Sequence, residues 1–228
     1  MNPSTHRRSP IVVLVVWTAG LVVLAAGIAA VLAADLGAGP LDVVSTAVAR
    51  LTGWPIGVPI MAINGALALA AWHLSGRVGA ATVATALLLG PLIDLWLIVF
   101  ASGPHVDSVR WAWLLLLVGV LLIGLGGAVQ IASGWGPSPL DAFCVAVSER
   151  RWSLRRVRTG TEISFAAVGG LAGGALSVGT LVVALGVGPA LAGWLRVVRR
   201  GPLAPPGPRP ARRRPRRRVR RRPRRHPS

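Results

Sequence analysis

Residues 37–42 read Gly-Ala-Gly-Pro-Leu-Asp, and a related pattern returns at residues 134–141, which read Gly-Trp-Gly-Pro-Ser-Pro-Leu-Asp. Each stretch follows a long apolar run and precedes a short one. Glycine and proline end the preceding helix, whereas proline suits the first position of a new helix, whose dipole an early aspartate complements. We therefore expect short helices to begin at Pro40 and Pro139.

The likeness between these stretches extends along the chain as an internal repeat. Beyond Pro-Leu-Asp, six residues in a stretch of fifteen recur with a shift of 98. The matching pairs are Thr82 and Thr180, Ala86 and Ala184, Leu87 and Leu185, Gly90 and Gly188, Pro91 and Pro189, and Trp96 and Trp194. Chance similarity between spans rich in Ala, Leu and Val is the alternative. Matches at Gly-Pro and Trp favour a true duplication.

The composition excludes a single soluble domain. Of the 228 residues, 53% are hydrophobic and only 14% are charged, against about 25% charged in an average soluble domain. The single cysteine, Cys144, cannot form an internal disulfide, and no Cys or His pair stands at metal-ligand spacing. We expect no metal and no cofactor.

Six apolar runs reach, or nearly reach, the roughly 18 to 20 residues that a helix needs to cross a bilayer. They cover residues 11–34, 55–74, 79–100, 111–133, 159–177 and 178–198. The boundary between the last two rests on a weak break near Ser177. The first run is longer than the apolar core of about 7 to 15 residues found in cleaved signal peptides, which disfavours that alternative.

These runs predict an all-α polytopic membrane protein with six transmembrane helices and short interfacial or re-entrant helices. Two three-span repeats, 11–100 and 111–198, are joined by an outer loop at 101–110 and flanked by residues 1–10 and 199–228. Because each repeat holds an odd number of spans, the second enters from the opposite side of the membrane. Secondary transporters share this inverted relation.

The arginines predict the orientation, because cytoplasmic loops are enriched in basic residues. With the amino terminus inside, only Arg50 and Arg110 fall outside. Tryptophans near the span ends agree with this placement of the spans. We therefore expect a bacterial cytoplasmic (inner) membrane protein with both termini in the cytoplasm.

Polar side chains inside spans mark a candidate pathway, because they are costly in lipid. Glu162 corresponds to Asn64 in the repeat, which predicts a shared central site. The alternative is an ordinary ion pair between Glu162 and Arg158, four residues earlier. Asp42 and Asp141 are expected to line gates or binding surfaces on opposite faces, or simply to stabilise the helices that they begin.

Gly90 and Pro91 precede Asp94 by one helical turn, and proline inside a helix frees a carbonyl and bends the axis. Asp94 is therefore a candidate gate residue, and a solvated helix end is the alternative. Gly188 and Pro189 are the corresponding hinge or kink in the second repeat.

The carboxyl-terminal tail has a different composition, dominated by Pro, Gly and Arg. Twelve arginines between Arg209 and Arg225 account for most of the net charge of +18. Such a segment cannot bury a core and is expected to be disordered. Arg212 to Arg225 could attract anionic lipid headgroups, and nucleic acid is a less expected partner.

The segments quoted above also point to a family. Residues 37–42, Arg158 with Glu162, residues 179–181 and Gly188-Pro189 together resemble the bacterial YczE/YyaS/YitT group of integral membrane proteins, over residues 11–198. The resemblance implies a multi-pass inner-membrane protein and supplies no substrate.

No nucleophile, zinc-peptidase or phosphate-loop motif occurs, so we expect no enzyme. The favoured function is a transporter or facilitator of a small solute with a site between the repeats. The alternatives are a membrane protein that binds or regulates a partner without transport, and a membrane-tethered nucleic-acid binder.

Overall fold

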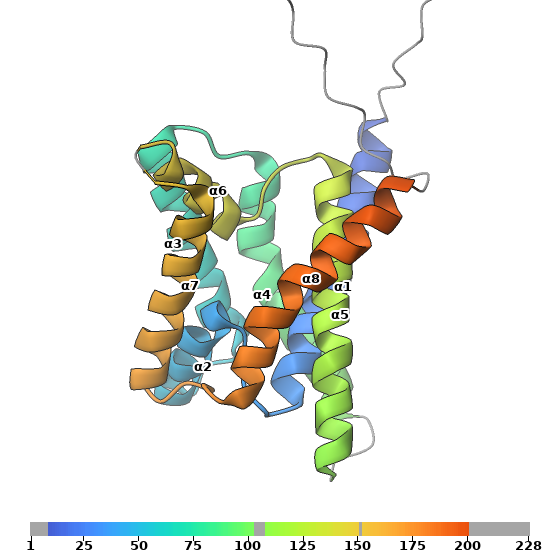
Figure 1. The fold of residues 1–228 in the computed structure, drawn as a ribbon, viewed down its shortest axis with the longest axis vertical. Coiled ribbons are helices and arrows are strands. Elements are labelled where there is room, and N and C mark those ends of the chain that lie inside the picture. The colour runs from blue at the N-terminus through green and yellow to red at the C-terminus, as the bar shows by residue number, and fades with distance from the viewer. Residues whose placement is uncertain (1–8, 103–107, 151, 201–228) are drawn as a thin grey trace, which may run out of the picture.

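The structure is a computed structural model that describes residues 9–102, 108–150 and 152–200. Within these ranges the chain forms eight helices and no strand (Figure 1). They are α1 (Pro10–Ala33), α2 (Pro40–Thr52), α3 (Gly57–Ser75), α4 (Ala80–Ala101), α5 (Val109–Ser133), α6 (Pro139–Ser148), α7 (Leu154–Leu171) and α8 (Val178–Arg200). The expected all-α class is confirmed for this part of the chain.

Five of the described helices are long and apolar enough to cross a membrane, namely α1, α3, α4, α5 and α8. At most 39% of the residues in their most apolar windows are buried inside the protein. The remaining apolar side chains face outward over far more area than a soluble monomer exposes. Lipid must cover this surface, so the chain is a multi-pass membrane protein.

α7 differs from the span expected at residues 159–177. It runs from Leu154 to Leu171, and three arginines and a glutamate in its first half set it apart from the five apolar helices. The apolar composition continues beyond the end of this helix, but Gly173 adopts a left-handed φ of 81°. That conformation redirects the chain, so the helix ends earlier than the hydropathy predicts.

The two ends of the helical bundle are distinct (Figure 1). α1 begins and α8 ends at one end, here called the terminal end, where the α3–α4 and α6–α7 connections also lie. The α1–α2, α2–α3 and α7–α8 connections lie at the opposite, distal end. Exposed tryptophans mark the terminal end at Trp72 and Trp152 and the distal end at Trp54 and Trp111, as in interfacial aromatic belts.

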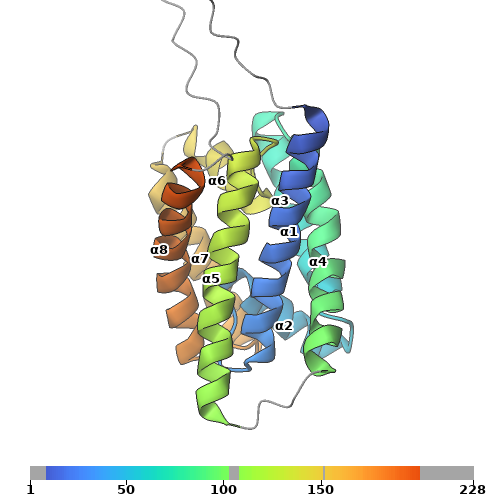
Figure 2. The ribbon, with the colours of Figure 1, turned by 90° about the vertical axis from the view of Figure 1, so that its right-hand side faces the viewer.

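Helices α1 and α5 pack along each other at the centre, with α4 against α1 and α8 against α5 (Figure 2). Glycines allow the close approach. A Cβ on Gly27 would lie 2.8 Å from the Gly119 carbonyl oxygen, and one on Gly20 would lie 3.0 Å from that of Gly126. Small residues bring transmembrane helices together in this way.

The remaining helices pack around the short ones, with α3 along α6 and α7 along α2. In addition, α3 packs on α4, where a Cβ on Gly90 would meet the backbone of Gly57. By contrast, α7 and α8 do not pack along each other in the described structure, and they diverge from their distal connection (Figure 1).

Several expectations fall wholly or largely outside the described residues. These are the cytoplasmic segment at 1–10, the outer loop at 101–110, the tail at 199–228 and the lipid contacts of Arg212 to Arg225.

Candidate functional site

Two adjoining cavities, of about 350 and 420 Å³, lie between the α5–α8 pair and helices α6 and α7. Residues of α5, α7 and α8 line both, so we treat them together as the central cavity. The smaller part reaches towards the terminal end beside the last turn of α5, and the larger part lies deeper. The polar and charged residues that line the central cavity include Asp42, Gln130, Ser138, Asp141, Arg158 and Glu162.

The beginnings of both short helices reach this cavity. α2 begins with Pro40 in its first turn after Gly39, and α6 begins with Pro139 after Ser138, whose hydroxyl caps the helix by accepting the Asp141 N–H at 3.2 Å. Residues 39–42 and Leu140 line the deeper part together. Neither helix is long enough to span a bilayer. Their positive dipole ends therefore converge on one space.

Arg158 joins two carboxylates at the cavity wall. Its Nη1 donates to Asp141 Oδ1 at 2.5 Å, and its Nε donates to Glu162 Oε1 at 3.1 Å. The Ser138 hydroxyl donates to the second oxygen of Asp141 at 2.9 Å. The three charged side chains retain between 33% and 44% exposure, so a ligand in the cavity can still reach them.

The ion pair between Glu162 and Arg158 was predictable from their four-residue spacing, whereas the bond from Arg158 to Asp141 was not. It joins α6 to α7, and no local pattern in the sequence reports that contact. Arg158 is thus a candidate site residue that the sequence placed at an ordinary helix end. The available signal was an arginine close to Glu162 in an otherwise apolar span.

Asp42 differs from Asp141 although both lie in the first turn of a short helix. No described side chain donates to its carboxylate. Partial burial in the apolar lining raises the pKa of the Asp42 carboxyl from its ordinary 3.8 to about 7. This group can therefore gain or lose a proton near neutral pH.

Gln130 is a second polar residue that the sequence did not single out. It lies in the last turn of α5, lines the cavity, is 8% exposed, and its Nε2 has no hydrogen-bond partner. A buried donor left unpaired costs about 1 to 3 kcal/mol. A polar ligand group or a water in the cavity would remove that cost.

Asn64 does not join this group. It is buried on α3, its amide donates to the Ile60 carbonyl one turn earlier at 2.9 Å, and it does not line the central cavity. The structure thus brings together Asp42, Asp141 and Glu162 from the predicted set. It does not bring Asn64 into contact with Glu162.

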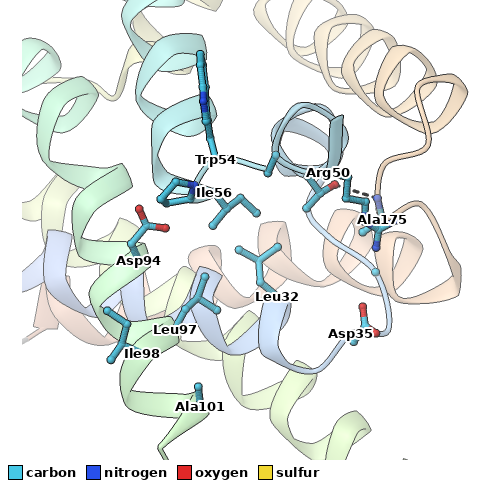
Figure 3. Close-up of a pocket in the computed structure, with 14 residues that line it drawn as sticks. Leu32, Asp35, Arg50, Trp54, Ile56, Asp94, Leu97, Ile98, Ala101 and Ala175 are labelled. Atoms are coloured by element: carbon cyan, nitrogen blue, oxygen red, sulfur yellow. Dashed lines mark hydrogen bonds between the residues drawn. The ribbon is translucent and has the colours of Figure 1, made fainter. Parts of the chain in front are cut away.

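Asp94 lies in a separate cavity of about 740 Å³ at the distal end (Figure 3). Its Oδ1 accepts the backbone N–H of Gly57 at 2.8 Å. The first residue of α3 is held in this way, and a carboxylate at a helix beginning is favourable. This bond gives Asp94 a role in packing α3 on α4, and its role as a gate stays a prediction.

The two Gly-Pro pairs lie inside α4 and α8 as expected, with Pro91 and Pro189 within the helices. Their surroundings differ. Gly90 is covered by Gly57, whereas a Cβ on Gly188 would meet nothing within 4 Å, and Gly188 lines the central cavity. The Gly-Pro pair of α4 is therefore packed against α3, whereas that of α8 faces open space.

A hydrogen-bonded junction closes the distal end and lies against the distal cavity (Figure 3). It joins residues 35–50 to residues 173–180 and is called the distal junction. Its bonds, donor first, are Ala38 N to Ala175 O at 2.9 Å, Ala175 N to Thr46 Oγ1 at 2.9 Å, Gly179 N to Leu36 O at 2.9 Å, Arg50 Nη1 to Gly173 O at 3.0 Å, and the Ser177 hydroxyl to Leu36 O.

The corresponding terminal junction joins residues 76–82 to residues 134–149. There the Thr82 hydroxyl donates to the Pro137 carbonyl at 2.9 Å. No other hydrogen bond joins these two segments within the described ranges. Residues 136–138 of the terminal junction line the smaller part of the central cavity, and residues 39–42 of the distal junction line its deeper part.

No three His, Cys, Asp or Glu side chains in the described part of the chain stand close enough together to share a metal ion.

Comparison with known proteins locates the chain among membrane proteins. Residues 11–196 match a family described as "Family of unknown function (DUF6198)". The chain is 30% identical over 180 residues to an uncharacterized membrane protein, YczE, of Bacillus subtilis (74% of this chain and 80% of that protein). It is 25% identical over 191 residues to YyaS of the same organism (79% and 91%).

An uncharacterized protein of Haemophilus influenzae is 27% identical over 186 residues, which cover 81% of this chain and 84% of that protein. No solved structure matches the chain significantly. The resemblance to YczE and YyaS inferred from the motifs is confirmed.

Proposed function

Because the chain belongs to the family of unknown function DUF6198, we propose its function from its own central cavity: transport or facilitated passage of a small solute, without catalysis. The cavity would face the two sides of the membrane in turn. The two halves of the chain would act as inverted three-span repeats, with α7 as the sixth span.

The packing of the described helices supports the inverted repeat. α1 with α4 corresponds to α5 with α8, α3 with α6 corresponds to α7 with α2, and α2 with α3 corresponds to α6 with α7. α7 has 18 residues, or about 27 Å at 1.5 Å per residue. Its charges are compatible with insertion, because Arg155 and Arg156 lie in its first turn at the terminal end and Arg158 is paired.

One observation carries the transport proposal. Asp141, Arg158 and Glu162 form a half-exposed ion-pair network beside the converging beginnings of two short helices. Transporters with inverted repeats place their substrate site at such broken helices, near the middle of the membrane. A purely structural network would not require a cavity beside it.

The arginines support a cytoplasmic terminal end in the inner membrane. The connections and helix ends at that end carry Arg77, Arg150, Arg155, Arg156 and Arg196, whereas the end of α2 and the beginning of α5 carry Arg50 and Arg110 at the distal end. Basic residues are enriched on the cytoplasmic side. The central cavity would then be accessible from the cytoplasmic half of the bilayer.

A thermal-stability screen of purified protein against metabolites, drugs and ions tests the proposal. A ligand that binds the native state raises the melting temperature, and we expect it to do so in the wild type and not in Glu162→Gln. Glu149→Gln is the matched control, because Glu149 is exposed and does not line the cavity.

A ligand that stabilises wild type and Glu162→Gln equally would contradict the assigned site. The absence of any stabilising ligand, together with a co-purifying protein, would favour the partner-binding alternative.

A further inference from the structure

We propose that the central cavity binds amphipathic organic cations, which enter it from the bilayer between α7 and α8. This inference rests on the proposed transport function and names its substrate class. An amphipathic cation here means a positively charged centre carried on an apolar body.

The charge balance of the cavity carries the first step. Its charged lining residues are three carboxylates, Asp42, Asp141 and Glu162, against the one guanidinium of Arg158. Above about pH 7, where Asp42 is ionised together with the other three groups, the lining has two excess negative charges. The two helix beginnings return about half a positive charge each, so about one negative charge stays uncompensated.

Two unpartnered polar groups carry the second step. Asp42 has no donor among the described side chains, and the Gln130 amide is more than nine-tenths buried without a partner. Arg158 and Glu162 satisfy each other. Asp42 is therefore the carboxylate left to balance a cation, while Gln130 can serve a polar substituent of the ligand.

The remaining lining is apolar and suits the body of such a ligand. It is supplied mainly by α5 and α8, through residues such as Ile123, Val187 and Leu191. A small hydrated cation would gain nothing from these walls, whereas an apolar body would be removed from water. Charge and apolar contact together define the ligand class.

The route follows from the difference between the two helix pairs. α3 seals on α4 because Gly57 meets Gly90, while α7 and α8 do not pack along each other. By the 98-residue shift, Arg155 stands where α3 has Gly57. A long charged side chain cannot make that close contact, so the cavity stays open between α7 and α8.

The test uses the full chain in phosphatidylcholine nanodiscs with tetraphenylphosphonium as the probe. Tetraphenylborate has the same shape and the opposite charge, and tetramethylammonium has the charge without the apolar body. With empty nanodiscs subtracted, we expect tetraphenylphosphonium to bind at least tenfold more tightly than either. Equal or tighter binding of tetraphenylborate would overturn the proposal.

Asp42→Asn and Glu162→Gln should weaken tetraphenylphosphonium binding about tenfold, whereas Glu149→Gln should leave it unchanged. The entry route has its own matched pair on α8. Gly188→Leu places a side chain in the open space that lines the cavity, and Gly193→Leu does so in open space that does not. Only Gly188→Leu should slow binding; equal rates in the two would refute the lateral route.

Uptake into proteoliposomes separates this inference from the transport function. Tetraphenylphosphonium binding without uptake would support the ligand class and refute transport. Uptake of an anionic or neutral solute, without tetraphenylphosphonium binding, would support transport and refute the ligand class.

Discussion

The distal and terminal junctions occupy matching places at opposite ends of the molecule, yet they are held very differently. Five hydrogen bonds join the two halves at the distal end, whereas a single bond, from Thr82 to Pro137, joins them at the terminal end. The central cavity touches both junctions, through residues 136–138 and residues 39–42.

The difference originates in the sequence, compared through the two shifts of the repeat, 99 residues at Pro-Leu-Asp and 98 residues at the Gly-Pro stretch. At each position the distal residue donates or accepts a hydrogen bond and the terminal residue cannot do the same. The changes, distal residue first, are Ala38 to Pro137, Thr46 to Val145, Ser177 to Gly79 and Arg50 to Glu149. Positions that match in the sequence repeat thus form several hydrogen bonds at the distal end of the described structure and one at the terminal end.

The largest expected effect comes from a glycine that occurs at both junctions, Gly37 at the distal one and Gly136 at the terminal one. Gly37 has φ of 131°, and a Cβ there would lie 2.7 Å from the Thr180 nitrogen. Gly37→Ala should lower the free energy of unfolding by about 4 kcal/mol, since backbone strain and overpacking each cost about 1 to 3 kcal/mol. Thermal unfolding in detergent measures this loss.

Gly136→Ala is the control at the terminal junction. Its Cβ would meet only the Ala81 methyl, at 3.0 Å, so a loss under about 1 kcal/mol is expected. Equal losses in the two variants would show that the junctions are alike.

The two aspartates of the short helices allow a second comparison, through pH. Because the Asp42 pKa is raised to about 7, the native protein holds a proton that the unfolded chain releases above about pH 4. The free energy of unfolding therefore falls as pH rises from about 4 to 7. Asp42→Asn should remove this slope and raise the free energy of unfolding at pH 8 by about 2 kcal/mol. This is about half of what a shift of three pKa units represents, because Asp42 is partly exposed.

Asp141→Asn should instead lower the free energy of unfolding, because it takes a carboxylate from Arg158. Melting temperatures from pH 5 to 8 distinguish the two. Parallel pH profiles for wild type and Asp42→Asn would contradict the burial argument, with Arg158 and Glu162 as the other charged groups facing the same space.

The long helices could be predicted from the sequence because hydropathy is a local property. The expected spans at 11–34 and 79–100 differ from α1 and α4 by one residue at each end. The span at 159–177 was misplaced because the arginines of α7 carry no apolar signal and Gly173 ends the helix. The short helices at Pro40 and Pro139 were predictable from Gly and Pro alone.

The site was predictable only where its residues share a helix. The spacing of Arg158 and Glu162 predicts their ion pair, and Asp42 and Asp141 indicate the beginnings of two helices. The contact of Arg158 with Asp141 is tertiary, and so is the burial of Gln130. The repeat paired Asn64 with Glu162, but two matching positions on different helices need not face the same cavity.

The distal junction can also be weakened by removing one hydroxyl. Thr46 is 7% exposed and accepts the Ala175 N–H. Thr46→Val leaves that N–H unpaired and should cost about 1.5 kcal/mol. The reciprocal Val145→Thr adds a hydroxyl at the exposed terminal position and should change stability by less than about 0.5 kcal/mol. Urea titration of the detergent-solubilised variants compares them, and a neutral Thr46→Val would contradict the ranking.

The smallest effect is expected for Arg50, whose bond to Gly173 O at 3.0 Å is the longest of the five. Arg50 is exposed, so water can replace the lost donor, and Arg50→Ala should cost about 0.5 kcal/mol or less. Arg110 is also exposed at the distal end, so Arg110→Ala is the control for the loss of a charge. If Arg50→Ala were as costly as Thr46→Val, then bond number rather than burial would determine how firmly this end is closed. The contrast between the junctions would then extend to the solvent-exposed rim of the molecule.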